Sequence, residues 1–206
     1  MASPKKISRI KESIVSSCQN CSGSGCSVCS LKCARVDKYA DAGIPVIYWM
    51  LSFKNFSGDK NFKEKMKSVV ADIDSFYDKG SSMLFVGGLG TGKTYMACAI
   101  LKLALLNGYT AKYTTMADSI SGIISGNDKK YMNELLKSDF LVIDEFDSRW
   151  IFPSDKAEKL FGSNLEHIVR NRFQNKLPTI LCSNTKDIDM VLSGDFSKSF
   201  KSLRSK

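Results

Sequence analysis

Apolar residues recur along this chain either at helical spacing or in short continuous runs. The segment 59–79 carries apolar residues three and four apart, with lysines and acidic residues between them, and this spacing predicts one amphipathic helix. Asp59 is placed to cap its first turn, and Gly80 comes just after its end. Further helices are predicted at 4–17, 33–42, 95–106, 116–125, 131–136 and 154–173.

Three short apolar runs predict buried strands between these helices, and one alternating segment, 109–115, predicts a further strand. The apolar runs cover residues 83–86, 140–143 and 178–183. Strands that alternate with helical segments are typical of a parallel sheet with helices on both faces. We therefore expect a three-layer α/β domain, with a five-stranded parallel sheet and right-handed crossovers.

The residues after the first apolar run fit the phosphate-binding pattern G-x-x-x-x-G-K-[ST], with a predicted strand before it and a helix after it. Glycines let backbone N–H groups turn toward a phosphate, and the helix directs the positive end of its dipole at the same anion. Lys93 is expected to reach the β- and γ-phosphates of ATP, and Thr94 to bind Mg²⁺ through its hydroxyl. The residues predicted to contact the nucleotide are Gly87, Gly88, Leu89, Gly90, Thr91, Gly92, Lys93, Thr94 and Tyr95.

Two carboxylates, Asp144 and Glu145, follow the apolar run 140–143. Ligands bind at the carboxyl ends of parallel strands, so Asp144 is expected to hold Mg²⁺ or one of its waters. Glu145 is expected to polarise the water that attacks the γ-phosphate. Asn184 ends the next apolar run and is placed to orient the same water. An Asp-Glu pair after an apolar run is a weak motif on its own. It becomes a strong one when it follows a phosphate loop in the same chain.

Five cysteines lie within the stretch CQNCSGSGCSVCSLKC. Cys18 with Cys21, and Cys26 with Cys29, form two C-x-x-C pairs, and Cys33 follows four residues later. A C-x-x-C pair directs two thiolates at one tetrahedral ion, so four of the five cysteines predict a zinc site. One of Cys26, Cys29 and Cys33 is then a spare. An iron–sulfur cluster, which also takes four thiolates, is the alternative metal centre.

The chain has 206 residues and a formal net charge of +9. This charge favours polyanionic partners, nucleic acid first, although a basic balance can also serve solubility alone. No apolar run approaches the roughly 20 residues that a membrane span needs, and the N-terminal stretch lacks the apolar segment of a secretory signal. Seven cysteines without such a signal indicate a reducing compartment. We therefore expect a cytoplasmic protein with no membrane partner.

The apolar and aromatic segment 44–53 precedes the first core helix. We expect it to pack against the core as a connector. The alternative is that Tyr48 and Trp49 cover the adenine base.

These motifs resemble the AAA+ ATPases, and among them the DnaC/DnaI-type loaders of replicative helicases, phage-encoded members in particular. The resemblance rests on the cysteine stretch, the segment AGIPVIYWMLSFKNF, the pair GGLGTGKT and FLVIDE, and the strand LPTILCSN. It implies that Lys93 and Thr94 belong to Walker A and that Asp144 and Glu145 form Walker B. It also implies that Asn184 is sensor 1.

The resemblance implies two parts: a basic helix with a cysteine-rich module at 1–43, and an AAA+ ATPase domain at 44–206 whose helical lid is reduced or absent. ATP, Mg²⁺ and Zn²⁺ are the implied cofactors. The implied partners are a replicative hexameric helicase, single-stranded DNA and further copies of the chain, which associate through the ATP site. The implied location is the bacterial cytoplasm.

Members of this family carry an arginine finger soon after sensor 1. The corresponding region KSFKSLRSK offers Arg204, and Arg170 and Arg172 are further candidates. Two other functions stay open: a transposition helper of the IstB type that acts on duplex DNA, and an ATP-gated adaptor with little hydrolysis. The cysteine stretch favours the loader, because it suits a module that docks on another protein.

Overall fold

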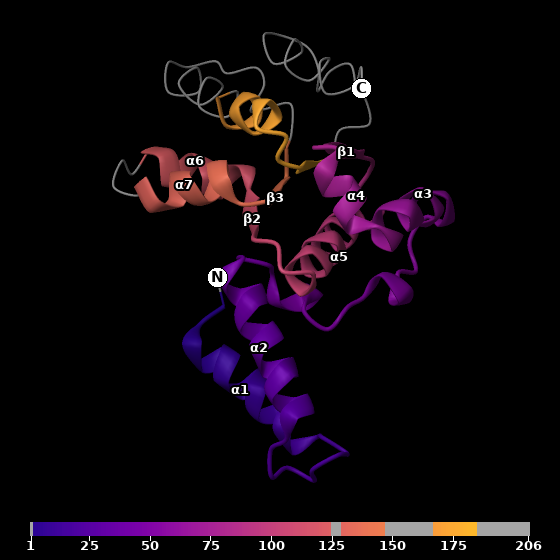
Figure 1. Cartoon of the computed structure of the whole chain (residues 1–206), viewed down its shortest axis with the longest axis vertical. Helices are drawn as coiled ribbons and strands as arrows, with labels where there is room; N and C mark the ends of the chain where they lie inside the picture. Colours follow the sequence, from indigo (N-terminus) through magenta and orange to yellow (C-terminus); the bar gives the residue numbers. More distant parts are fainter. Residues whose placement is uncertain (1, 125–128, 147–166, 185–206) are drawn as a thin grey trace.

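The computed structural model describes residues 2–124, 129–146 and 167–184. In this part of the chain a parallel sheet lies between two layers of helices, and a pair of N-terminal helices projects from one end of that body (Figure 1). The predicted α/β class and layering are therefore confirmed.

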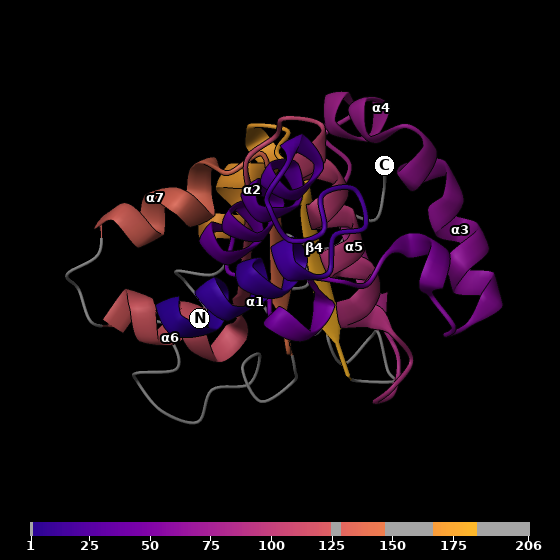
Figure 2. The same cartoon turned by 90° about the horizontal axis from the view of Figure 1, so that it is seen from below.

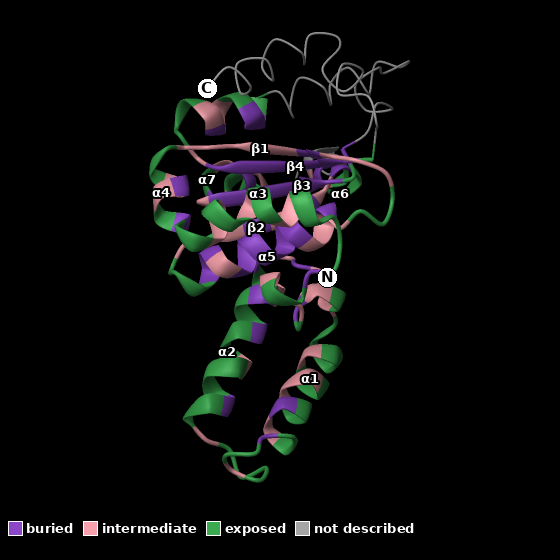
Figure 3. Ribbon diagram, turned by 90° about the vertical axis from the view of Figure 1, so that its right-hand side faces the viewer, coloured by how far each residue is buried: buried purple, intermediate pink, exposed green. Residues whose placement is uncertain are grey.

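Four parallel strands form the sheet in the described residues, in the order β1-β4-β3-β2 (Figure 3). We expected five strands, and the described residues contain four. Each of the four predicted strand segments forms one of them. The strands are β1 Met83–Val86, β2 Ala111–Thr115, β3 Phe140–Asp144 and β4 Thr179–Ser183.

Alternate residues of the strands face two separate cores. Phe140 and Val142 of β3 pack in the same cluster as α5 (Lys93–Leu106), whereas Leu141 and Ile143 belong to the cluster on the opposite face. Figure 2 shows α5 on one side of the strands and α6 and α7 on the other. The elements that contribute to the second cluster are α6 Met116–Ile124, α7 Lys129–Lys137 and the helical residues 167–174.

The predicted helix 59–79 is broken into α3 (Lys60–Ala71) and α4 (Ile73–Asp78). Its N-cap is confirmed, because the Asp59 carboxylate accepts a hydrogen bond from the Phe62 N–H at 2.6 Å. The break falls at Asp72, which leaves the helical conformation (φ −144°, ψ 80°) and caps the Ser75 N–H at 2.8 Å. Asp competes with the helical backbone through such local hydrogen bonds, so the same residue ends one helix and begins the next.

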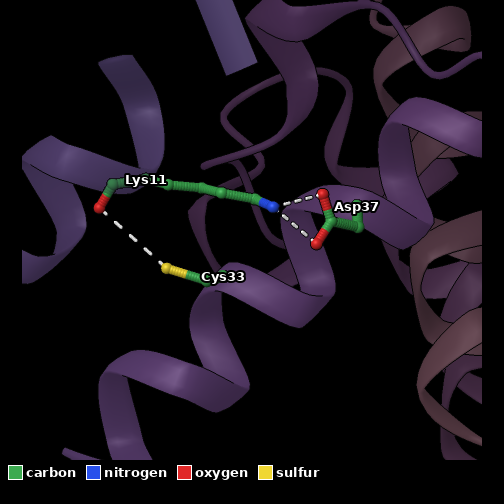
Figure 4. Close-up of polar contacts among 3 residues, drawn as sticks. All are labelled: Lys11, Cys33 and Asp37. Carbon is green, nitrogen blue, oxygen red and sulfur yellow. Dashed lines mark hydrogen bonds and ion pairs between the residues drawn. The ribbon is translucent and has the colours of Figure 1, made fainter. Parts of the chain in front are cut away.

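The projecting pair consists of α1 (Pro4–Ser16) and α2 (Ser27–Asp41). The α2 helix begins inside the cysteine stretch, earlier than the predicted helix at 33–42. An ion pair joins the two helices: the Lys11 ammonium lies 2.5 Å from the Asp37 carboxylate (Figure 4). The Cys33 thiol faces the Lys11 carbonyl oxygen at 3.9 Å beside it.

The connector 44–53 packs against the core, as expected. Trp49 is 4% exposed, and its indole N–H donates to the Ile44 carbonyl at 2.8 Å. This burial removes the Trp49 ring from any role in covering an adenine base. The connector is folded as two 3₁₀ turns, η1 Val46–Tyr48 and η2 Phe53–Asn55. Within the described residues, each helix is too short or too polar to cross a membrane.

Candidate nucleotide site and cysteine cluster

The phosphate loop joins β1 to α5, as the motif predicts. Gly90 and Gly92 adopt left-handed φ angles of +75° and +89°, which a residue with a side chain rarely adopts. Gly92 is also the residue that precedes α5, and a Cβ there would lie 2.5 Å from the Phe56 ring. The loop therefore needs glycine at position 92 for its backbone angle and for the close approach of Phe56.

Lys93 is 7% exposed at the first turn of α5. Its ammonium donates to the carbonyl oxygens of Gly87 at 2.8 Å and Gly88 at 2.7 Å, and lies 3.3 Å from the Thr91 hydroxyl. Burial lowers the pKa of Lys93, and the nearby Asp144 carboxylate acts in the opposite direction. Phosphate oxygens would offer stronger acceptors than these carbonyls, because both partners in the hydrogen bond would then be charged.

The far side of the loop is held to the connector. Tyr95 follows Thr94 in α5, and its hydroxyl donates to the Ser52 carbonyl at 2.8 Å. The Tyr95 ring meets the Phe56 ring edge-on, with centroids 5.3 Å apart. Leu89, at the tip of the loop, is 84% exposed. Of the residues predicted to contact nucleotide, Tyr95 thus has a second role, which is to fix the connector beside the loop.

Asp144 is the last residue of β3 and is 6% exposed. One carboxylate oxygen accepts from the Tyr113 hydroxyl at 2.8 Å, and the other accepts from the Glu145 N–H at 2.8 Å. Burial is the main cause of a raised pKa at Tyr113, and the Asp144 charge adds to it, so this hydroxyl stays a donor. Each carboxylate oxygen keeps a further lone pair for an ion.

Glu145 follows in a left-handed conformation, with φ +56°, and its side chain is exposed. Such a conformation costs a non-glycine residue on the order of 1–3 kcal/mol and is found most often at functional sites. The two carboxylates also differ in burial. Asp144 is buried against Tyr113, whereas the Glu145 side chain is exposed.

Asn184 directly follows β4, which lies between β1 and β3. The Ser183 carbonyl accepts from the Gly87 N–H at 3.3 Å, and the Cys182 carbonyl accepts from the Phe146 N–H at 2.8 Å. The end of β4 is thus bonded to the start of the phosphate loop and to the residue after Glu145. The fold brings the predicted Walker A, Walker B and sensor residues to one edge of the sheet.

The cysteine cluster brings four sulfur atoms close together. The sulfur atoms of Cys18, Cys21, Cys26 and Cys29 all lie within 4.8 Å of one another. Three of their separations are 3.9, 3.5 and 3.6 Å. Four thiolates around one zinc ion at about 2.3 Å would lie about 3.8 Å apart, so the residues fit this ion. Cys33 lies outside this group of four, and its thiol faces the Lys11 carbonyl oxygen on α1 (Figure 4).

Thiol crowding in the cluster shifts the pKa values of Cys18 and Cys29 in opposite directions. The hydrogen bond between Cys18 and Cys29 is the largest cause for both: it lowers the pKa of Cys18 and raises the pKa of Cys29 to about 12. The sulfurs are therefore close enough to compete for protons. A divalent cation relieves such competition, because it binds all four as thiolates.

Comparison with known proteins identifies the family. The family model described as "IstB-like ATP binding protein" matches residues 50–189, which include the phosphate loop and both carboxylates. The chain belongs to the IstB-like ATP-binding protein family. The match covers more than half of the chain and ends beyond Asn184.

Two relatives with assigned names extend the comparison. The replicative helicase loader DnaC of Escherichia coli K12 is 30% identical over 160 residues, which are 73% of this chain and 62% of that protein. DnaC of Buchnera aphidicola subsp. Baizongia pistaciae is 30% identical over 151 residues, or 69% of this chain and 59% of that protein. This chain thus spans about three fifths of the length of these relatives.

Solved structures support the same fold. A crystal structure of the DnaC helicase loader matches with a TM-score of 0.57 at 21% identity, and covers 78% of this chain and 89% of that one. A crystal structure of DnaI matches with a TM-score of 0.59 at 17% identity, over 78% and 85% of the two chains. Together with the phosphate loop and the parallel sheet, these matches place the IstB-like domain in the P-loop AAA+ fold.

One of the predicted arginine-finger candidates has a different role in this IstB-like domain. Arg172 is 0% exposed and lies between the sheet and α7. Its guanidinium donates to side-chain and carbonyl oxygens, and burial lowers its pKa to about 9. An arginine enclosed in this way cannot reach a neighbouring molecule, so Arg172 is a core residue and not a finger. Its acceptors lie on Thr179, Leu135, Ser138, Asp139 and Pro178.

The other predicted residues divide between the surface, the core and the undescribed part of the chain. Arg170 and His167 are exposed on the helical residues 167–174. Cys98 and Cys182 are buried in the core. Arg204 lies outside the described residues.

Two residues with a function in the site were missed from the sequence. Tyr113 orients Asp144 from the neighbouring strand, and no local pattern marks it. Lys102 is 6% exposed in α5 and donates to the carbonyls of the connector residues Tyr48, Trp49 and Leu51. The sequence did offer a signal for Lys102, because it is the one charged residue in the otherwise apolar stretch ILKLALL.

Proposed function

We propose that this chain is an ATP-hydrolysing loader that binds a replicative hexameric helicase and places it on single-stranded DNA during replication initiation. One observation carries the proposal: a complete phosphate loop adjoins Asp144 and Glu145 in a chain whose named relatives are replicative helicase loaders. The net charge of +9 supports a nucleic-acid partner.

In the proposed reaction, Lys93 exchanges the Gly87 and Gly88 carbonyls for the β- and γ-phosphates of ATP. Thr94 and Asp144 would hold Mg²⁺, which neutralises phosphate charge when bound. The exposed Glu145 carboxylate accepts a hydrogen bond from the attacking water and polarises it. Asn184, placed between the loop and Glu145, orients that water with its amide.

The ATP site is proposed to lie between two copies of the chain, as the resemblance to AAA+ loaders implies. A neighbouring arginine would supply a positive charge at the γ-phosphate, and such a finger contributes about 10³-fold or more to the rate. Arg204 is the proposed finger. Without an arginine from a neighbouring copy, we expect ATP hydrolysis to be slow. We expect the rate to rise when copies of the chain associate on DNA or on the helicase.

The cysteine cluster is proposed to hold one zinc ion through Cys18, Cys21, Cys26 and Cys29. Zinc would fix the turn between α1 and α2, because it would cross-link that turn through four cysteines. Few of the described hydrogen bonds stabilise the turn. The helical pair can then serve as a rigid docking module for the helicase.

The first experiment is a pull-down of the purified chain against the replicative helicase of its host, with and without ATP, together with metal analysis of the same sample. We expect a stable complex and about one zinc per chain. Absence of a complex under both conditions contradicts the loader proposal. Iron in place of zinc would contradict the assignment of the metal alone.

The second candidate is an IstB-type transposition helper, which the family match itself favours. It predicts ATP-dependent binding of duplex DNA in preference to single strands.

An ATP-gated adaptor is the third candidate function. In that case a Glu145→Gln variant keeps full partner binding and full function, whereas the loader proposal requires loss of hydrolysis and of loading.

A further inference from the structure

A groove of about 660 Å³ lies between the N-terminal helical pair and the nucleotide-binding core. One wall is α2, and the other is the connector with the end of α5. Its rim exposes aliphatic side chains: Met50 is 67% exposed, Leu106 46% and Val28 36%. Large aliphatic side chains that gather around one hollow are a common mark of a protein interaction site.

The charges around this groove are all positive. Lys32 and Arg35 line it and are exposed, whereas its lining contains neither Asp nor Glu. Val28, Lys32 and Arg35 are four and seven residues apart on α2, so they share one face of that helix. The third cation in the lining, Lys102, is buried and is occupied by connector carbonyls. The free positive charge therefore lies on α2 alone.

Nucleic acid fits this groove poorly. Single strands bind by stacking their bases on accessible aromatic rings. Of the rings in the lining, Tyr39 is 8% exposed and Trp49 4%, and the Lys63 ammonium lies 5.8 Å from the centre of the Phe53 ring. The accessible surface is aliphatic on both walls and also cationic on α2, which matches an amphipathic protein helix with acidic residues.

We propose that this groove receives an acidic amphipathic helix of the replicative helicase. The apolar side chains of that helix, spaced three and four apart, enter between α2 and Met50, and its carboxylates meet Lys32 and Arg35. Charges at the rim steer the encounter, and the apolar anchors slow dissociation. This inference rests on the proposed loader function and adds to it the contact site and the chemistry of the partner segment.

The test measures binding of the full-length chain to the purified host helicase by biolayer interferometry. The double variant Lys32→Glu with Arg35→Glu, and separately Met50→Asp, are each expected to weaken binding at least tenfold. The matched control is Lys60→Glu with Lys65→Glu, which makes the same change of charge on exposed residues of α3 outside the groove. The control should bind within twofold of the unaltered chain. Zinc content and circular dichroism check that each variant is folded.

A photo-crosslinking residue at Met50 identifies the partner segment. We expect it to capture a helicase peptide with apolar residues at helical spacing and at least two acidic residues. Crosslinking to single-stranded DNA instead overturns the proposal. The proposal is also overturned if the groove variants bind the helicase as tightly as the unaltered chain, or if the control variant weakens binding as much as they do. In either case the proposed loader function stands. If the unaltered chain does not bind the helicase at all, the loader function and this inference both fail.

Discussion

Asp144 shows how single residues prepare the nucleotide site. Both of its oxygens accept hydrogen bonds from the protein, one from Tyr113 and one from the Glu145 backbone. The carboxylate orientation is therefore fixed by the strands before any ion arrives. Hydrogen bonds to a charged group typically contribute about 1.5–3 kcal/mol, so loss of one donor should be measurable in hydrolysis.

Tyr113→Phe removes the hydroxyl that holds Asp144 and keeps the ring. We expect ATP hydrolysis to fall about tenfold, which corresponds to about 1.4 kcal/mol, and the Mg²⁺ concentration for half-maximal rate to rise. Phosphate release measured across a Mg²⁺ series checks both. Tyr109→Phe is the matched control, because it removes a similar Tyr–Asp hydrogen bond, to Asp74, away from the site. Equal effects of the two substitutions would contradict the role of Tyr113.

Arg172→Met tests the reassignment of that arginine to the core. It leaves several buried carbonyl oxygens without their donor, and we expect the free energy of unfolding to fall by about 3 kcal/mol or more. Urea unfolding of the variant measures this. Arg170→Met, on the exposed side of the same helical segment, should cost much less. A stable Arg172 variant that has lost only hydrolysis would instead restore the arginine-finger interpretation.

At the scale of elements, the cysteine segment was predicted from spacing, but the choice among its members was not. Spacing alone left Cys26, Cys29 and Cys33 as equal candidates for the spare. The start of α2 at Ser27 decides between them. A helix from that point turns Cys29 back toward the first pair, and it carries Cys33 one turn further, against α1.

Cys29→Ser and Cys33→Ser form a matched pair that tests this choice. Each replaces one thiol by a hydroxyl in α2. We expect Cys29→Ser to lose most of its bound zinc and Cys33→Ser to keep about one zinc per chain, because only the first removes a ligand. Inductively coupled plasma mass spectrometry of both purified variants gives the answer. Equal loss of zinc would place Cys33 among the ligands.

The helix predicted at 59–79 shows a limit of periodicity. The apolar residues keep their spacing across the whole segment, yet Asp72 divides it into α3 and α4. Periodicity reports which face is buried and does not report local capping. Asp72, a polar residue with a short side chain in the middle of the segment, was the sequence feature that could have indicated the break.

At the scale of the whole molecule, the net charge of +9 predicts binding to the phosphate backbone of single-stranded DNA. Affinity should fall linearly on a plot of log affinity against log salt. If about four phosphates are neutralised, the slope is about −2.8, and a fourfold rise in salt weakens binding about 50-fold. Fluorescence anisotropy with a labelled oligonucleotide, from 50 to 200 mM salt, measures the slope. An affinity that does not change over this range would contradict an electrostatic contact.

The sequence by itself determined the strands, the phosphate loop, the Asp-Glu pair and the cysteine-rich stretch of this protein. The motifs join residues close along the chain, and their spacing therefore carries the information. The strands were visible as short apolar or alternating segments, although their pairing partners are distant, as Met83 pairs with Ile180. It also predicted the edge of the sheet at which Asn184 lies, since strand ends in a parallel sheet meet on one side.

Only the tertiary structure decided which groups from distant segments meet. It paired Tyr113 with Asp144, buried Arg172 among oxygen acceptors from five residues, and tied the connector to α5 through Lys102. The groove between α2 and Met50 likewise forms only when these distant segments pack together. The physical reason is that the burial and hydrogen-bond partners of a long polar side chain depend on neighbours far away in sequence. A pattern of residue types alone does not specify them.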